Sequence, residues 1–135
     1  MTREIAIKTA AKWWTDKLRE RAPHSNGDNS PGSLIAMALA DIMATPLSEK
    51  QLAKFQKALE ETIDQDLNIY GDYGIRIVCD YGPDHILFGA AHQANINANN
   101  FPYKTNMAIK KNGDAYTVLV SDGYDQPYEK VKPCE

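Results

Sequence analysis

The chain has 135 residues and a formal net charge of −3, with 43% hydrophobic and 24% charged residues. These values predict a single globular domain that buries its own core, and they exclude a low-complexity chain. The longest apolar run, residues 34–40, is too short to span a bilayer. The first residues include an acid and no apolar block, and two cysteines, Cys79 and Cys134, do not make a disulfide framework. We therefore expect a reduced, cytoplasmic protein with no signal peptide, no cofactor and no membrane contact.

Charge is unevenly distributed along the chain. Residues 1–22 contain six basic and three acidic side chains, whereas residues 59–84 contain seven acids against Arg76 alone. The acidic segment is interpreted either as a solvated helix end or as a patch that docks a basic partner. Basic residues are few and dispersed, so direct nucleic-acid binding is not expected.

An amphipathic helix is predicted from about residue 2 to residue 21. One face of its 3.6-residue repeat consists of Ile7, Ala11, Trp14 and Leu18. Trp13 points about 100° away from Trp14 around the helix, so the two rings cannot share that face. Either Trp13 borders the core and packs on the stem of Lys17, or it is an exposed anchor for a partner.

Two more helices are predicted before residue 70. Residues 22–33 form a flexible loop, and residues 31–44 form a nearly all-apolar helix buried in the core or in an oligomer interface. The next helix begins at Ser48, which forms a capping box with Gln51. Its inward stripe consists of Leu52, Phe55, Leu59, Ile63 and Leu67. The acids of its C-terminal half oppose the helix dipole, which indicates a purpose other than stability.

Residues 73–121 indicate a strand, a helix, a strand, a tight turn and a strand. The first strand alternates, with Ile75, Ile77 and Cys79 on its inner face. The helix, from about residue 83 to 94, directs these residues inward: Ile86, Leu87, Ala90, Ala91 and Ala94. The Asn112–Gly113 pair indicates a hairpin. The first strand is expected either to run parallel to the second through a right-handed crossover or to be separated from it by the third.

The turn between the first strand and this helix is a candidate ligand pocket, because free backbone N–H groups point outward at a helix N-terminus. The pocket residues are Asp80, Tyr81, Asp84, His85, Asn99 and Asn100. In the structural alternative, Asp84 complements the helix dipole and Asp80 satisfies turn amides. An acid–base pair drawn from Asp80, Asp84 and His85 would instead make a small hydrolase or transferase.

No metal site is predicted. His85 and His92 are seven positions apart on one helix, whereas two ligands of one metal need a spacing of three or four. Gly89 lies between them on the same face, and its open floor suits close packing or a small ligand.

A surface for a protein partner is expected in the C-terminal half and at the acidic patch. All seven tyrosines follow residue 69, and residues 95–105 are rich in asparagine, as recognition surfaces often are. The predicted partner-binding residues are Trp13, Glu60, Glu61, Asp64, Tyr103, Lys104 and Tyr124.

Three sequence blocks resemble a group of short proteins carried by bacteriophages and prophages. The blocks are AAKWWTDKL at 10–18, DYGPDHIL at 80–87 and NFPYKTNMAI at 100–109. The resemblance follows the chain in order over its length. It implies an accessory protein that neutralises a host defence, as anti-CRISPR proteins do, by binding a protein or trapping a signal molecule. It brings no catalytic residues with it.

Together these features predict one α+β domain over residues 1–135. We expect the order α-α-α-β-α-β-β, a mainly antiparallel three-stranded sheet and a tail at residues 122–135. The open edges of such a sheet favour a homodimer. The expected function is non-enzymatic inhibition of a bacterial defence protein by direct contact. The alternatives are a small-ligand or nucleotide-signal binding protein and the hydrolase or transferase considered above.

Overall fold

The computed structural model describes residues 1–20, 47–70, 74–79, 82–97, 101–102, 104–122 and 127–134. Its elements are α1 (Arg3–Glu20), α3 (Glu49–Tyr70), β1 (Ile75–Cys79), α4 (His85–Ala94), β2 (Thr105–Asn112), β3 (Ala115–Asp122) and β4 (Glu129–Lys130). The α+β class is confirmed. The order within the described residues is α-α-β-α-β-β-β. The loop predicted at 22–33 and the helix predicted at 31–44 lie outside these residues.

The sheet has four antiparallel strands in the order β1-β2-β3-β4, so the expected three-stranded sheet is wrong. The additional strand, β4, lies in the segment that was expected to be a tail. Both arrangements expected for the first strand are also wrong, because β1 pairs directly with β2 and runs antiparallel to it. Cys79 lies opposite Thr105, so the connection through α4 leaves and re-enters the sheet at the same end.

The hairpin between β2 and β3 turns one residue later than the Asn112–Gly113 pair suggests. Asn112 pairs with Ala115, which leaves Gly113 and Asp114 as the two central residues. Gly113 has φ +66°, whereas Asp114 is not among the described residues with positive φ. A positive φ at the first central residue alone is the pattern of a type II′ turn.

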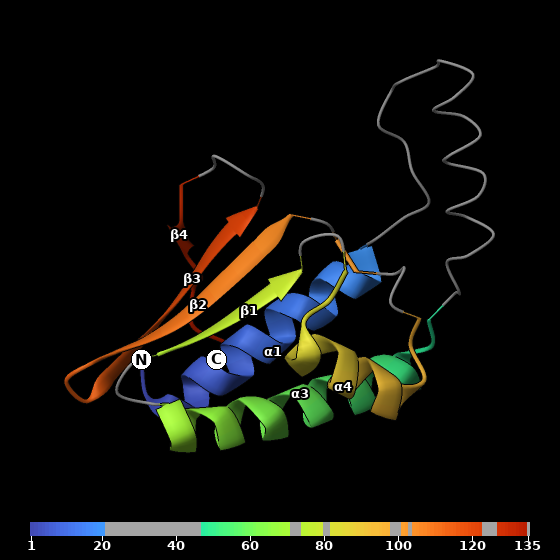
Figure 1. The fold of residues 1–135 in the computed structure, drawn as a ribbon, viewed down its shortest axis with the longest axis horizontal. Coiled ribbons are helices and arrows are strands. Elements are labelled where there is room, and N and C mark those ends of the chain that lie inside the picture. Colours follow the sequence, from blue (N-terminus) through green and yellow to red (C-terminus); the bar gives the residue numbers. More distant parts are fainter. Residues whose placement is uncertain are drawn as a thin grey trace, which may run out of the picture.

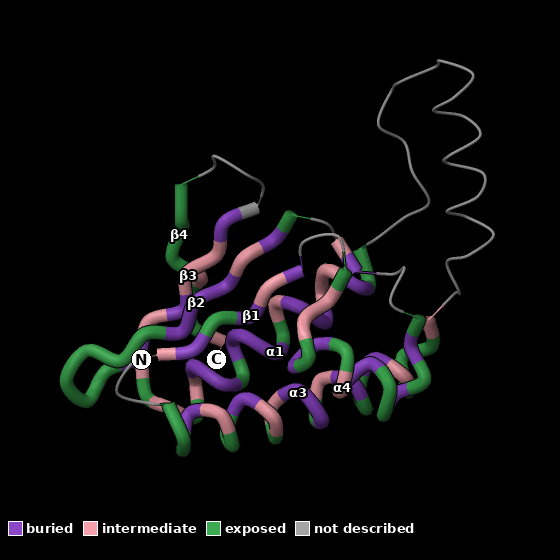
Figure 2. The backbone as a smooth tube through the Cα atoms, viewed as in Figure 1, coloured by how far each residue is buried: buried purple, intermediate pink, exposed green. Residues whose placement is uncertain are grey.

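The three described helices cover one face of the sheet (Figure 1). α1 contacts β2 and β3, α4 contacts β1, and α3 packs against both α1 and α4. Figure 2 shows the buried positions on the sides of the helices and strands that face each other, whereas the tip of the β2–β3 hairpin is exposed. None of the helices in the described part of the chain combines the length and apolar character needed to cross a membrane.

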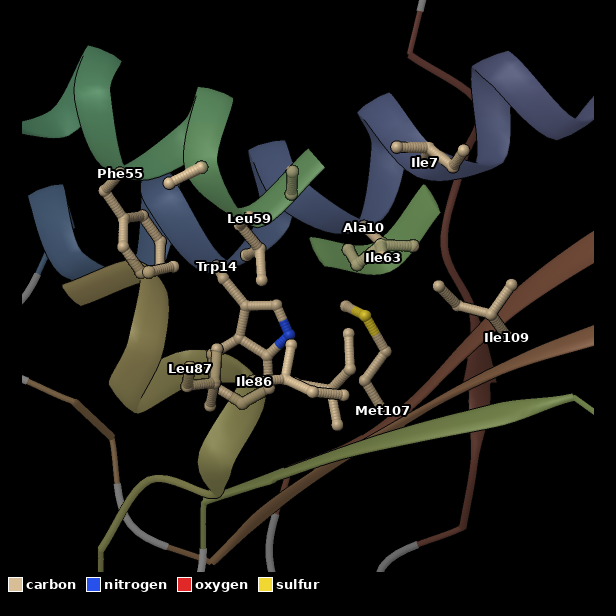
Figure 3. Close-up of a cluster of buried hydrophobic side chains, with 14 of the residues drawn as sticks. Ile7, Ala10, Trp14, Phe55, Leu59, Ile63, Ile86, Leu87, Met107 and Ile109 are labelled. Carbon is tan, nitrogen blue, oxygen red and sulfur yellow. The ribbon is translucent and has the colours of Figure 1, made fainter. Parts of the chain in front are cut away.

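The core lies between these helices and the sheet (Figure 3). Every inward residue predicted for α1, α3, β1 and α4 is buried, so those periodicities are confirmed. Trp14 is fully buried and makes an edge contact with Phe101 at 6.5 Å between ring centroids. Phe101 in turn lies 5.7 Å from Phe55 and joins α1 to α3 through a residue that precedes β2.

Polar contacts fix how α1 and α3 align. The Arg19 guanidinium donates to both carboxylate oxygens of Glu49 at 3.1 and 3.0 Å, and Arg3 donates to Asp64 Oδ1 at 2.9 Å and Asn68 Oδ1 at 2.7 Å. The hydrogen bond from Arg19 holds the pKa of the Glu49 carboxyl below its ordinary value. The Arg19–Glu49 pair therefore contributes to stability at pH values above the pKa that Glu49 has in the unfolded chain. This contribution is lost as the pH falls through the pKa that Glu49 has in the folded protein. Because both pairs are exposed, they orient the helices more than they stabilise them.

The capping box predicted at the start of α3 is confirmed. The Ser48 hydroxyl accepts from the Gln51 backbone N–H at 3.1 Å, and the Gln51 side chain accepts from the Ser48 backbone N–H at 3.0 Å. Gln51 Nε2 also donates to the carbonyl of Asn95 at 3.1 Å. The start of α3 is thereby tied to the end of α4.

Candidate binding face of the sheet

The face of the sheet opposite the helices is where the described side chains form a candidate site. The strand register places the outward residues in rows that cross the strands. One row consists of Arg76, Ala108, Leu119 and Lys130. The neighbouring outward positions on β2 are Asn106 and Lys110. We call this surface the open face.

A hollow of about 580 Å³ lies on the open face. Ala108 and Leu119 lie at its floor by register, and its rim includes Arg76, Lys110 and Tyr128. Gly74, which has no side chain, also lines it. An apolar floor with a few polar groups at its rim is the usual composition of a binding site.

Arg76 is held over this face by uncharged groups. Its Nη2 lies 3.3 Å from both Asn106 Oδ1 and the Tyr128 hydroxyl. The ion pairs formed by the described residues use Arg3, Lys12, Lys17 and Arg19 and none includes Arg76. Arginine most often pairs with a carboxylate when its guanidinium is ordered. In the described part of the chain, this guanidinium therefore has no anion.

The open face is cationic, whereas the chain as a whole is acidic. Its outward positions include Arg76, Lys110 and Lys130, and among the described outward residues there is no Asp or Glu. The acids Glu60, Glu61 and Asp64 belong instead to α3, in the layer of helices on the other side of the sheet. This separation of charge makes the open face suitable for an anionic partner.

Sequence reasoning did not select the residues of the open face. From the sequence, Arg76 stands out as the one base among the acids of residues 59–84 and, by the alternation of the first strand, as an outward position. Lys110 could have been added by extending the same alternation into the hairpin. Lys130 and Tyr128 could not, because a two-residue strand has no recognisable alternation.

At the turn between β1 and α4, where a ligand pocket was predicted, Asp84 has a structural role. Asp84 is the N-cap of α4 and accepts from the Leu87 backbone N–H at 3.0 Å. Its other carboxylate oxygen accepts from the Val78 backbone N–H at 2.8 Å, and the Asp84 N–H donates to the Val78 carbonyl at 2.9 Å. The carboxylate thus closes the outer edge of β1 as well as the end of the helix. His85 is exposed.

Replacing Asp84 with alanine should lower the free energy of unfolding by about 2 kcal/mol, since a helix cap and a strand anchor are lost together. Asp84→Asn should lower it less, because the amide retains one acceptor. His85→Ala should change it by less than about 0.5 kcal/mol, as expected for an exposed side chain. Urea denaturation of the three variants measures these differences. An Asp84→Ala variant as stable as the parent protein would refute the structural role.

The other predicted pocket and partner residues are only partly described. Asp80, Tyr81, Asn99, Asn100, Tyr103 and Tyr124 lie outside the described residues. Lys104 is exposed and has a positive φ of 59°. Of the described candidates, Asp84 and His85 lie together at the start of α4. Lys104 lies elsewhere in the chain, directly before β2.

The predicted partner residues on α1 and α3 mostly make contacts within the chain. Trp13 is half-buried against the core, with Lys17 Nζ 5.2 Å from the centroid of its ring. This is the first of the two arrangements considered for Trp13. Asp64 is paired with Arg3, Glu60 is half-buried and Glu61 is exposed.

The outward side of α4 contains His85, Phe88 and His92. Phe88 is 57% exposed and its ring stacks on that of His92, with centroids 6.4 Å apart and planes at 13°. Apart from Gly89, its two chain neighbours and the backbone of its own helix, no atom of the described residues lies within 4 Å of the position that a Cβ on Gly89 would take. Within the described part of the chain, no three His, Cys, Asp or Glu side chains are grouped as metal ligands would be.

Comparison with known proteins adds no assignment. No protein-family model matches this chain, and the search of curated proteins finds no similar sequence.

Proposed function

We propose that this chain is a non-enzymatic binding protein that holds a protein partner on the open face of its sheet. The observation that supports this proposal is the combination of Arg76, Lys110 and Lys130 on a face without described acids. Between these cations lie buried Ala108 and half-buried Leu119, so a partner can gain charge pairing and further burial of Leu119 there.

Binding is favoured over catalysis by the roles of the residues once considered for acid–base chemistry. Both carboxylate oxygens of Asp84 accept backbone N–H groups. A carboxylate used in this way is poorly placed to exchange protons with a substrate. The open face itself offers cations, an amide and a phenol at the hollow, which suit binding of an anion.

The resemblance to small phage and prophage proteins supports a specific form of this function. In that form the partner is a bacterial defence protein, and binding inhibits it by direct contact. An acidic surface on the partner would complement the open face. The acidic half of α3 would then face away from the partner, contrary to the docking surface expected from the sequence.

The test is capture from bacterial lysate with a pair of variants matched in charge. Arg76→Glu combined with Lys130→Glu reverses two cations of the open face, whereas Lys54→Glu with Lys57→Glu reverses two exposed cations of α3. We expect the parent protein and the α3 variant to retain the same partner at fixed stoichiometry, and the open-face variant to lose it. Retention by both variants, with both folded by circular dichroism, would refute the proposal.

A small-ligand binder is the second candidate, because about 580 Å³ falls in the range of ligand pockets. Such a ligand would raise the melting temperature of the parent protein. It would have no such effect on Arg76→Gln. Native mass spectrometry of protein captured from lysate separates the two candidates, since it resolves a retained small mass from a retained protein.

A further inference from the structure

The spacing of charges on the open face defines the kind of segment that it can bind. Arg76 and Lys130 are the two ends of one row that crosses the four strands, with Ala108 and Leu119 between them. Neighbouring strands are about 4.8 Å apart, so the backbones at the two ends of the row are separated by about 14 Å. The row therefore has the order cation, apolar, apolar, cation.

An extended peptide has a repeat that matches this row. Its side chains alternate between two sides, and each residue advances about 3.3 Å, so residues i and i+4 lie on the same side about 13 Å apart. Residue i+2 lies midway on that side. A segment laid across the strands could thus direct acids at i and i+4 to Arg76 and Lys130, once the Arg76 guanidinium leaves Asn106 and Tyr128 for a carboxylate. Its residue i+2 would then lie over Ala108 and Leu119.

We infer that the open face selects an extended acidic segment with the pattern acid–x–apolar–x–acid. This inference rests on the proposed function, since it names the part of the partner that the open face receives. Lys110 lies on β2 diagonally from Arg76 and lines the same hollow, so it adds a second cation near the first acid.

The guanidinium of Arg76 is suited to exchange its present contacts for a carboxylate. Among the described residues the hydrogen bonds of this guanidinium are made by Nη2, and both are 3.3 Å long and go to uncharged oxygens. A bidentate carboxylate would approach to about 2.8 Å and would make charge-assisted bonds about twice as strong. Asn106 and Tyr128 therefore compete only weakly with an anion for this side chain.

A peptide fits this face better than a nucleic acid does. A polynucleotide would meet three cations at the described outward strand positions, in a chain of net charge −3, whereas tight binding to phosphates needs many Lys and Arg residues. The floor is aliphatic, and among the described residues that line the hollow Tyr128 is the one aromatic residue, so a row of described rings on which successive bases could stack is missing. Acidic side chains separated by an apolar one use both the charges and the floor.

The experiment measures fluorescence anisotropy of labelled peptides on the full chain. The first probe contains Glu-Ser-Leu-Ser-Glu between neutral residues, and the second has the same composition with the two acids adjacent. A third has Gln in place of Glu, and a fourth probe is single-stranded oligothymidine. We expect the spaced peptide to bind about tenfold more tightly than the adjacent-acid peptide, as two well-placed charged contacts require.

The variants assign the contacts. Arg76→Gln and Lys130→Gln should each weaken binding of the spaced peptide about tenfold. Arg76→Lys should also bind more weakly than the parent protein, because lysine cannot make the bidentate contact with a carboxylate. Lys54→Gln on α3 is the control and should have no effect. Equal binding of the spaced and adjacent-acid peptides would overturn the inference, and so would tighter binding of oligothymidine. Tyr128→Phe removes only one hydroxyl group from this face and should leave the fold intact.

The two proposals fail differently. If charge reversal on the open face abolishes capture of the protein partner but the peptides are not distinguished, the proposed function stands and this inference is wrong. If the spaced peptide is selected but capture of the partner is unaffected by charge reversal, the face binds acidic segments and the proposed function is wrong.

Discussion

Replacing Trp14 with alanine should lower the free energy of unfolding by about 3–5 kcal/mol, the cost of removing a large aromatic side chain from a core. Trp14 is fully buried where α1 faces the sheet and α4 (Figure 3). Its ring contacts Phe101 at 6.5 Å and Trp13 at 5.0 Å, so the substitution leaves a cavity among aromatic neighbours that cannot all move into it. Urea denaturation followed by far-ultraviolet circular dichroism measures the loss.

Two controls make this expectation specific. Trp13→Ala should cost clearly less, because that ring is half-buried at the border of the core under Lys17. Trp14→Phe should also cost less than Trp14→Ala, since Trp14 Nε1 is buried without a hydrogen-bond partner among the described residues and its loss removes no such bond. Equal losses for Trp13→Ala and Trp14→Ala would show that the core is not centred where these contacts place it.

The helical core was predictable because its information is local. Leu52, Phe55 and Leu59 repeat with the period of one helix face, and all three are buried. The capping box at Ser48 is equally local, since both of its partners lie within one turn. Periodicity therefore identified the inward residues of the described helices, because burial along a helix depends on residues that are close in sequence.

The open face could not be predicted because its residues meet only through the sheet. Arg76 and Tyr128 are 52 positions apart in the chain and are joined by one hydrogen bond. Their meeting depends on the order of all four strands, and β4 has only two residues. Local composition drew attention to the acids of α3 instead, where Asp64 is tied to Arg3 of α1.

The strand-to-helix turn illustrates why a sequence cannot by itself separate structural from chemical roles. Asp84 and His85 are residue types that catalyse reactions, and they stand at a helix start that often binds ligands. The same position is where a helix most needs a side-chain acceptor. Only the two bonds to Val78 and Leu87 assign the Asp84 carboxylate to capping.

Replacing Gly74 with alanine should destabilise the protein by more than the cost of placing an L residue at a positive φ, because the new methyl group would also clash with β2. Gly74 has φ +78°, and a Cβ built there would lie 2.7 Å from the carbonyl oxygen of Ile109. The conformation alone costs an L residue about 1–3 kcal/mol. Relief of the clash requires backbone movement, since no side-chain rotation can move a Cβ and the Ile109 carbonyl belongs to the main chain of β2. Chemical denaturation should therefore show a loss at or above the upper end of that range.

Gly113→Ala is the matched control for this prediction. Gly113 has φ +66°, but apart from Gly113 and its two chain neighbours no atom of the described residues lies within 4 Å of the position its Cβ would take. Its substitution should cost only about 1–2 kcal/mol for the left-handed backbone. Gly74 also lines the hollow of the open face, so movement of β1 should weaken binding of the spaced acidic peptide while Gly113→Ala leaves it unchanged. Equal destabilisation by the two substitutions would mean that β1 and β2 can separate at Gly74 without cost, and the hollow would then lack the rigid edge that the proposed binding requires.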